Sequence, residues 1–438
     1  MFLKELGVAF IGAAIAVTAI TVSKAQAEEV LYIPNFSYRS GPYAPNGISF
    51  ANGARDYAEM INKRDGGVQG VKILYEECET GYSTQAIVEC YERLKNKHGG
   101  PRFVHPNSTG GTYQIIPKAT VDKIVVHSMG YGMTAAADGR VFPWVFNFPT
   151  TYWSQASAFV RYIGSEEGGL SNLKGKKIAL VYHNSPYGKE PIPTLQALGS
   201  KYGFDLQLLA VDHPGQEQKA TWLQVRRGKP DWILLWGWGV MNQVALKEAV
   251  AIKFPMDHML GVWWSGAESD VVPSGAAAKG YKAGTFHSPG HGTKAHGDIL
   301  KHVYNGDLAK AKKNNFGEVL YNRSIIAYTY ALEAINSAMN KYGKGKVPTP
   351  EQVRWGFENL NLTEARLNEL GLSGFTRGHQ VSCADHEGNG PVLIQQWTGE
   401  RWEIITDWIE PIREVVRPMI EQAAAKFAKE NNIQPRSC

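Results

Sequence analysis

The stretch DWILLWGWGVMNQVALKEAVAI, residues 231–252, contains the pattern that decides the fold. Its first six residues are almost all apolar, as in a strand that is buried on both faces of a parallel sheet. Its second half, from Asn242 to Ile252, has the spacing of a helix with one apolar face. A buried strand followed directly by a helix is the unit from which parallel α/β sheets are built.

The same alternation continues on both sides of this stretch. Around it we predict strands at residues 176–183, 204–210 and 259–263, with a helix at 192–202. An earlier series of the same kind has predicted strands at residues 30–36, 71–76, 102–105 and 124–128, separated by helices. Pro117 lies inside the last of those helices, so we expect a kink or a late helix start there. Two such series in 438 residues predict two doubly wound lobes.

The C-terminal third has a different pattern. It contains long helical segments at residues 319–342 and 351–360 and a strand pair, 392–397 and 402–406, around Thr398-Gly399-Glu400. An amphipathic helix is predicted at residues 412–429.

The N-terminus has the three parts of a secretory signal. Lys4 precedes an apolar run from Leu6 to Val22, and Ala25-Gln26-Ala27 matches a small-residue cleavage site. An uncleaved membrane anchor is the alternative, because the apolar run is slightly long for a signal. The cleavage site favours an exported protein in an oxidising compartment, the periplasm.

The four cysteines, Cys78, Cys90, Cys383 and Cys438, therefore predict disulfides. Three pairings are possible. Cys78 ends a predicted strand and Cys90 lies on the apolar face of the next helix, so we expect these two to pair and to leave Cys383 with Cys438. The alternative is that Cys90 is a reduced core residue.

Composition and motifs exclude several functions. The net charge of +5 is modest, and no basic stripe with interleaved aromatic residues suggests a nucleic-acid partner. Phosphate loops, nucleophile elbows and His-Glu-x-x-His pairs do not occur, so neither an enzyme nor a cofactor is indicated. The one candidate metal cluster has irregular spacing in a glycine-rich segment, which argues against a zinc site; it comprises His287, His291, His296 and His302.

Tryptophans mark the carboxyl ends of the second series of strands. Trp236, Trp238, Trp263 and Trp264 all lie at or just after strand ends. Ligands of open parallel sheets bind at that edge. The alternative is packing between lobes, which for Trp236 and Trp264 is equally well supported.

At this point the chain resembles a known family, the leucine/isoleucine/valine-binding proteins. Ser40-Gly41-Pro42, Asn52-Gly53-Ala54-Arg55 opening a helix and residues 62–67 closing it are similar to the first βα unit of that family. Tyr187-Gly188, after the strand that ends at His183, is similar to the start of its second lobe. The resemblance covers nearly all of the chain after the signal.

The resemblance implies a type I periplasmic-binding fold, in which two doubly wound lobes are joined by three crossovers. We place these crossovers near Pro149, Phe286 and Thr376. The resulting expectation is a signal at 1–27, lobe 1 at 28–148 plus 287–375, lobe 2 at 149–286 plus 376–410, and a C-terminal helical extension at 411–438.

The resemblance also implies a ligand site between the lobes. Ser108 and Thr109 stand where hydroxyls hold a ligand carboxylate, in a glycine-rich turn before a helix whose dipole favours an anion. The remaining residues that match the family's ligand loops and aromatic walls are Tyr43, Ser128, Gly130, Tyr131, Tyr187 and Trp238.

One position departs from the family pattern. The amino-acid binders place an acidic residue after the strand that here ends at Val262, to pair with the ligand's ammonium group, whereas this chain has Trp263. A desolvated ammonium without a partner costs several kcal/mol, so we expect Trp263 to face an apolar or aromatic acid. Glu268 is the alternative acidic partner.

The expected function is therefore that of a solute-binding protein of an ABC importer, which closes about a hinge over a small carboxylate. Its expected partners are the ligand, a membrane permease and an ATPase, and it is expected to be a monomer without metal or cofactor. Alternatives are a branched-chain amino acid or short amide as ligand, or ligand sensing for a membrane receptor. An enzyme would convert the bound compound rather than release it unchanged.

The signal sequence generates the first testable prediction. Cleavage after Ala27 should leave a mature chain that begins at Glu28, because signal peptidase requires the small residues of Ala25-Gln26-Ala27. Intact-mass measurement on material from the periplasm checks this. A mass that includes residues 1–27 would favour the uncleaved anchor.

Overall fold

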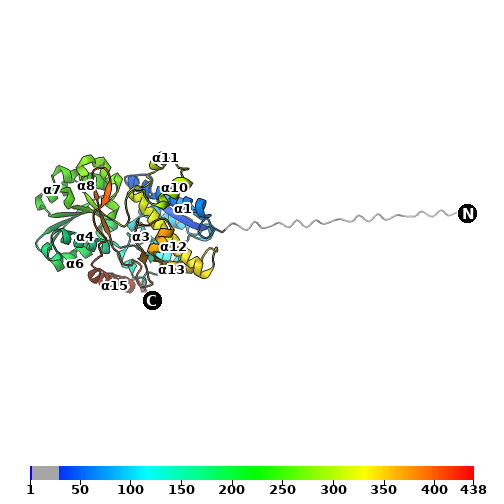
Figure 1. Ribbon diagram of the computed structural model, residues 1–438. Coiled ribbons are helices and arrows are strands. Elements are labelled where there is room, and N and C mark those ends of the chain that lie inside the picture. The colour runs from blue at the N-terminus through cyan, green and yellow to red at the C-terminus, as the bar shows by residue number, and fades with distance from the viewer. Residues whose placement is uncertain (2–28) are drawn as a thin grey trace.

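Two groups of parallel strands form the framework of the computed structural model, which describes Met1 and residues 29–438 (Figure 1). Apart from Met1, the expected signal and its cleavage site before Glu28 lie outside the described residues. The α/β class predicted from the strand–helix alternation is confirmed. No helix in the described part of the chain is long and apolar enough to cross a membrane.

The larger sheet has seven strands in the order β13-β12-β9-β8-β7-β5-β6. Strands β5 to β9 are parallel, and β12 and β13 form the predicted hairpin, with β12 antiparallel to β9. The strands are β5 (Lys177–His183), β6 (Asp205–Val211), β7 (Trp232–Trp236), β8 (Met259–Gly261), β9 (Lys282–Thr285), β12 (Leu393–Trp397) and β13 (Trp402–Ile404). Four helices surround this sheet in Figure 1, namely α4 (Tyr152–Glu166), α6 (Ile192–Tyr202), α7 (Lys219–Gly228) and α8 (Val240–Ala251).

The second group of strands comes mainly from the first part of the chain. Strand β1 (Leu31–Ser37) is parallel to β2 (Ile73–Glu79), and β3 (Val126–His127) is parallel to β4 (Val145–Phe146). Residues 104 and 105 join the two pairs through parallel bridges from Val104 to Val126 and from His105 to Asn35. The helices of this side include α1 (Ala44–Asp65), α2 (Thr84–Leu94), α3 (Thr109–Asp122), α10 (Lys294–His302), α12 (Val319–Tyr342) and α13 (Pro350–Glu358).

The remaining short elements lie in the connections. They are α5 (Pro186–Lys189), α9 (Glu268–Val271), α11 (Leu308–Lys312), α14 (Glu364–Glu369), β10 (Asn361–Leu362) and β11 (His379–Gln380). The strand groups agree with the two expected lobes, while the lobe boundaries at individual residues stay predictions.

Two helices differ from the sequence prediction. Helix α3 begins at Thr109 and continues through Pro117, because Ser108 caps its start and its inner face is buried at Ile115 and Ile116. Helix α4 was not predicted. Nearly all of its residues are buried, so it lacks the alternation of polar and apolar residues that reveals a surface helix.

Both predicted disulfides are present. Cys78 at the end of β2 is bonded to Cys90 in α2, and Cys383 is bonded to the terminal Cys438. The second bond ties the end of the chain to the segment before β12.

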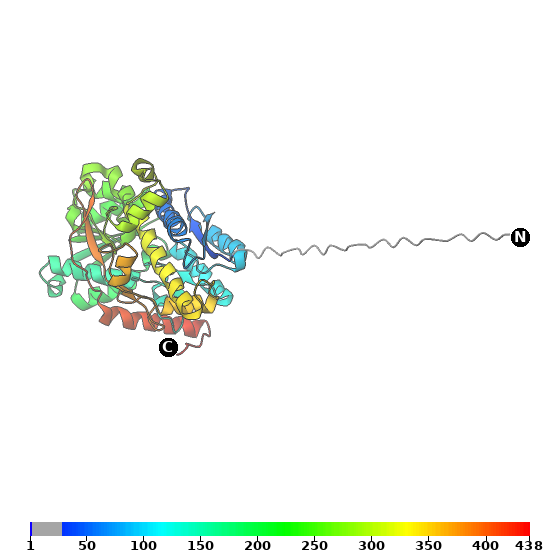
Figure 2. The ribbon, with the colours of Figure 1, turned by 45° about the vertical axis from the view of Figure 1, so that its right-hand side comes forward.

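The C-terminal extension forms helix α15 (Arg413–Glu430), drawn red along the base of the molecule in Figure 2. Val416 and Ile420 cluster with Trp153 of α4, and the ring of Phe427 lies 4.7 Å from that of Phe142. The helix therefore packs against elements of both lobes.

Seven buried histidines make the fold sensitive to acid. Burial is the main cause that lowers their pKa, to about 4 in His105 and about 3 in His386 for example. The full set is His105, His127, His183, His287, His296, His379 and His386. In the unfolded chain a histidine has a pKa of about 6.5.

Because the folded-state pKa values are lower than the unfolded one, the unfolded chain binds more protons as the pH falls below about 6.5. Each histidine should then remove up to about 2 kcal/mol of stability between pH 7 and pH 5. Urea unfolding at pH 7, 6 and 5 should show this loss, and H386Q should show a smaller one. If the free energy of unfolding depended on pH equally in the wild type and H386Q, His386 would not have the lowered pKa described above.

Candidate functional site

A pocket lies between the two groups of strands. Eight of its eleven lining residues are aromatic, three are polar and none carries a charge. The lining residues are Tyr38, Phe50, Tyr82, Asn107, Ser108, Thr109, Tyr131, Tyr152, Tyr187, Trp238 and Trp264. About 330 Å³ between these side chains is free of protein atoms, part of it continuous with solvent. Only about 20 Å³ of it could be occupied by the centre of a water-sized sphere, so the rings nearly fill the pocket in this structure.

The carboxyl ends of strands position most of this wall. Tyr38 directly follows β1, and Tyr82 lies three residues after the end of β2. In the larger sheet, Tyr182 of β5 is paired with Trp236 of β7, and Trp238 follows two residues later. Since parallel strands end at a common edge, their following loops meet in this pocket.

The polar residues of the pocket stand at the start of helix α3. Ser108 is the N-cap, and its Oγ accepts a hydrogen bond from the Gly111 backbone N–H at 3.2 Å. Thr109 Oγ1 accepts one from Gly132 N at 3.3 Å. The Ser108 hydroxyl also lies within hydrogen-bond reach of Tyr82, and the Thr109 hydroxyl within reach of Tyr152, so each can donate either to a phenol or to a ligand. The positive end of the helix dipole also faces this side of the pocket.

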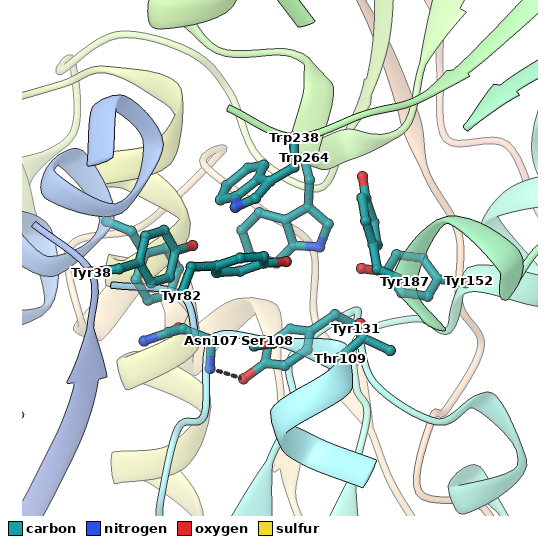
Figure 3. A pocket seen from close by; sticks show the side chains of 11 residues that line it. Tyr38, Tyr82, Asn107, Ser108, Thr109, Tyr131, Tyr152, Tyr187, Trp238 and Trp264 are labelled. Carbon is teal, nitrogen blue, oxygen red and sulfur yellow. Dashed lines mark hydrogen bonds between the residues drawn. The ribbon is translucent and has the colours of Figure 1, made fainter. Parts of the chain in front are cut away.

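Asn107 holds the turn before this helix. Its φ of 53° is in the left-handed region, which asparagine tolerates better than most residues. Its backbone N–H donates to the Tyr131 hydroxyl at 2.8 Å, the bond dashed in Figure 3. Its side-chain amide donates to Asn35 Oδ1 and to the Phe36 carbonyl.

The aromatic side chains pack against one another around the pocket. The Trp238 and Trp264 rings are 5.5 Å apart in an edge-to-face arrangement, and Tyr131 meets Trp264 at 5.8 Å in the same way. Tyr152 and Tyr187 have ring centroids 5.5 Å apart. Such contacts fix the wall and reduce the entropy that ordering a ligand would cost.

Two buried donors in this wall have no partner. The indole Nε1 atoms of Trp238 and Trp264 are buried and make no hydrogen bond. Figure 3 shows the nitrogen of Trp264 and the hydroxyl of Tyr82 pointing toward the middle of the pocket. Unpaired buried N–H groups are costly, so a ligand oxygen would complete the Trp264 indole, whereas the Trp238 indole lies within reach of the Tyr38 hydroxyl (Figure 3).

The tyrosines of the wall are neutral near pH 7. Burial raises the pKa of Tyr38, Tyr82, Tyr131, Tyr152 and Tyr187 far above the ordinary value of 10. Their hydroxyls can therefore donate or accept hydrogen bonds without adding negative charge.

Five of the nine ligand residues predicted from the sequence line the pocket. They are Ser108, Thr109, Tyr131, Tyr187 and Trp238. The other four, Tyr43, Ser128, Gly130 and Trp263, lie next to the pocket without lining it.

The structure places these four residues in supporting positions. Tyr43 packs against Tyr82 with ring centroids 4.5 Å apart, and its hydroxyl lies 2.8 Å from His183 Nε2. Ser128 is buried, and its Oγ accepts from Asn147 Nδ2 at 3.1 Å. The Gly130 carbonyl accepts from Trp263 Nε1 at 3.2 Å.

Trp264, rather than Trp263, occupies the expected aromatic position in the wall. Trp263 is fully buried, with its ring 4.1 Å from Phe286 and 4.7 Å from the Arg323 guanidinium. The short helix of residues 263–265 after β8 turns the two neighbouring indoles in different directions.

Glu268 does not line the pocket either. Its carboxylate accepts the Val319 backbone N–H at 2.9 Å, and burial raises its pKa to about 8. It caps the start of helix α12 in this structure.

The histidines of the rejected metal cluster have separate partners. His287 Nδ1 is 3.0 Å from the Ser288 carbonyl, and His296 Nε2 is 2.8 Å from Asn322 Oδ1. Within the described residues, no three His, Cys, Asp or Glu side chains form a group that could hold a metal.

Sequence reasoning missed four aromatic residues of the wall, Tyr38, Phe50, Tyr82 and Tyr152. Tyr38 and Tyr82 follow strands just as Trp238 does, so the signal was present but was applied only to tryptophans. Phe50 and Tyr152 lie within helices and have no such marker. Asn107 directly precedes the predicted Ser108-Thr109 turn and was given no role of its own.

Comparison with known proteins agrees with this architecture. The periplasmic binding protein family matches residues 30–401. A crystal structure described as an ABC transporter permease from the Pseudomonas fluorescens group is 42% identical, with a TM-score of 0.86, and the match covers 94% of this chain and 100% of that one. A search of curated proteins found no match.

More distant structures share the fold alone. A branched-chain amino acid ABC transporter protein from Thermus thermophilus with bound valine is 20% identical, with a TM-score of 0.71 over 89% of this chain and 98% of that one. A solute-binding protein from R. palustris in complex with benzoate is 14% identical, with a TM-score of 0.68 over 87% and 97%. The resemblance inferred from the sequence is thus confirmed at the level of the family: the chain belongs to the periplasmic binding protein family.

Proposed function

We propose that the pocket binds a small organic acid with an aromatic or apolar body, and that the two lobes close over it about their hinge. The observation that carries this proposal is the separation of chemistry within the pocket. The uncharged polar side chains stand together at the start of helix α3, and aromatic rings, some with a phenol or indole donor, form the rest of the wall.

The donors suit a carboxylate. The Ser108 and Thr109 hydroxyls lie at the positive end of helix α3, where an anion is favoured. The unpaired Nε1 group of Trp264 adds a donor from the opposite lobe. A carboxylate can accept hydrogen bonds from several donors at once, so it could satisfy groups of both lobes.

The same pocket is poorly suited to an amino acid. No acidic side chain lines it, so a ligand ammonium group would lose its hydration without gaining a charge partner. That loss costs several kcal/mol, and cation–π attraction to Trp264 would recover only part of it. The R. palustris protein, with benzoate in its crystal, supports the view that this fold can hold an aromatic acid.

We infer closure of the two lobes because each lobe contributes part of the pocket wall. Tyr38, Ser108 and Tyr131 come from the first lobe, whereas Tyr187 and Trp264 come from the second. A ligand that contacts both sides favours the closed form by its differential contacts. We infer that the closed protein, a monomer in the periplasm, then delivers the acid to a permease driven by an ATPase.

Calorimetry with two matched pairs of ligands tests the proposed ligand class. Benzoate should bind and benzamide should bind far more weakly, because only the acid carries the charge that the α3 N-terminus favours. Likewise 3-phenylpropanoate should bind more tightly than phenylalanine, which adds an ammonium group. Tight binding of phenylalanine or leucine would overturn the proposal, and recovery of a chemically altered acid would indicate an enzyme.

Substitution of each of the two adjacent tryptophans distinguishes the one that contacts the ligand from the one that supports the pocket wall. W264A should weaken a bound acid by roughly 2 kcal/mol, as expected for an aromatic anchor. W263A should instead lower the free energy of unfolding by about 3–5 kcal/mol, because it empties a fully buried site. Calorimetry and urea unfolding on both variants distinguish the two effects. A W264A variant with unchanged affinity would remove Trp264 from the site.

A further inference from the structure

One carboxylate of the second lobe is held entirely by donors of the first. Glu190 directly follows helix α5, and its Oε1 accepts the Tyr113 hydroxyl hydrogen of helix α3. Its Oε2 accepts from Thr134 Oγ1 at 2.6 Å and from Thr134 N at 3.3 Å. Thr134 begins the short helix of residues 134–137 that follows β3.

This contact lies beside the pocket without belonging to its wall. Tyr113 is one helical turn after Thr109 on α3, and Glu190 comes three residues after Tyr187. The bridge therefore joins the two segments that present pocket residues from opposite lobes. Trp153 Nε1 donates to the Glu190 carbonyl at 2.7 Å and helps to fix this segment in its own lobe.

Two other side chains that bond across the lobes also have partners in their own lobe. Asp270 accepts from Asn46 of helix α1 at 3.2 Å, but also from Asn242 and the Ala267 backbone. His183 bonds Tyr43 across the interface and Ser185 beside it. Only the carboxylate of Glu190, among these three, would lose all its hydrogen bonds if the lobes separated.

We propose that Glu190 is the latch of the closed form: it sets ligand affinity through the bridge to Tyr113 and Thr134 and does not touch the ligand. This proposal rests on the hinge closure proposed above. It makes Glu190 a positioning residue for binding.

The Glu190 latch should make closure of the lobes weaker as the pH rises. In the closed form burial raises the pKa of Glu190 to about 7, although the hydrogen bonds from Thr134 and Tyr113 oppose the rise. The titratable groups that face it are the phenols of Tyr113 and Tyr152, whose pKa burial raises far above neutral. A solvated glutamate in the open form has a pKa of about 4.3.

Between about pH 4.3 and pH 7, Glu190 is therefore ionised in the open form and takes up a proton when the lobes close. Above pH 7 the side chain stays ionised, so closure must remove the Glu190 carboxylate from water. For this group alone, affinity should fall about tenfold from pH 6 to pH 8.5. Glu268, His183 and Asp270 also titrate at the interface, so the test compares variants rather than the wild type alone.

The experiment uses the full chain as wild type, E190Q, E190A and the control E217Q, an exposed glutamate of the same lobe. Calorimetry with benzoate, or with valine if valine binds more tightly, is run at pH 6, 7 and 8.5. Radii of gyration from solution scattering are measured at the same pH values with and without the probe. Melting temperatures show whether each variant is folded.

Between pH 6 and pH 8.5, the affinity of the wild type and of E217Q should fall by about tenfold through Glu190. E190Q has no charge to desolvate at this position, so its affinity should not show this tenfold fall. E190A leaves the Tyr113 and Thr134 donors unpaired on closure, so it should bind about tenfold more weakly at pH 6. Without a probe, the radius of gyration should rise with pH more in the wild type than in E190Q.

Two results would overturn the latch: parallel pH responses of the wild type and E190Q, or unchanged affinity in a folded E190A. The proposed function fails differently. If neither benzoate nor valine binds, the ligand class is wrong, and the scattering comparison still decides the latch. If the wild type binds a probe without contracting, hinge closure is wrong and the latch with it.

Discussion

The carboxyl ends of parallel strands impose the constraint on which the rest of this structure depends. A parallel strand must leave the sheet at the edge where its neighbours leave, so the residues that follow β1, β2, β7 and β8 converge. In this chain those residues are largely aromatic, and they bury one another between the lobes. The pocket is the space that these rings leave at the start of helix α3.

Charge is kept out of the pocket but not out of its surroundings. Behind the aromatic wall, the Arg323 guanidinium lies 4.7 Å from the Trp263 ring and 5.5 Å from the Trp264 ring, fully buried. Burial lowers its pKa to about 9, and the nearby carboxyls of Asp270 and Glu268 oppose that shift. The two indoles thus separate an ionic layer from the ligand space. An acid in the pocket would face donors and rings, while the Arg323 guanidinium lies against the Trp264 ring and does not line the pocket.

The sequence predicted the framework well because strand and helix periods are local properties. The helix at 192–202 and the long helix at 319–342 were predicted with the bounds observed for α6 and α12. Helix α4 was not predicted because it is buried on nearly all sides and therefore lacks the alternation of polar and apolar residues. Pro117 misled the prediction of α3, since the cap at Ser108 and tertiary burial outweigh one lost backbone hydrogen bond.

The site was only partly predictable, and for a different reason. The Ser108-Thr109 turn could be found because a polar, glycine-rich segment before a helix is visible in the sequence. Which of two adjacent tryptophans faces the ligand depends on the backbone turn after β8, and sequence spacing does not determine that turn. The contact between Glu190 and Tyr113 joins residues 77 positions apart and leaves no local signal.

A clamp works only if its lobes do not close firmly without a ligand. The contacts between lobes must therefore be slightly too weak to hold the closed form alone, so that the ligand's own contacts decide the population. A carboxylate suits this balance, because the hydrogen bonds that it gains on closure are offset by the cost of removing its charge from water. Glu190 with neutral donors only, Tyr113 and Thr134, is poised in this way. A lysine or arginine partner would have made the bridge stronger and the closed form less dependent on what fills the pocket.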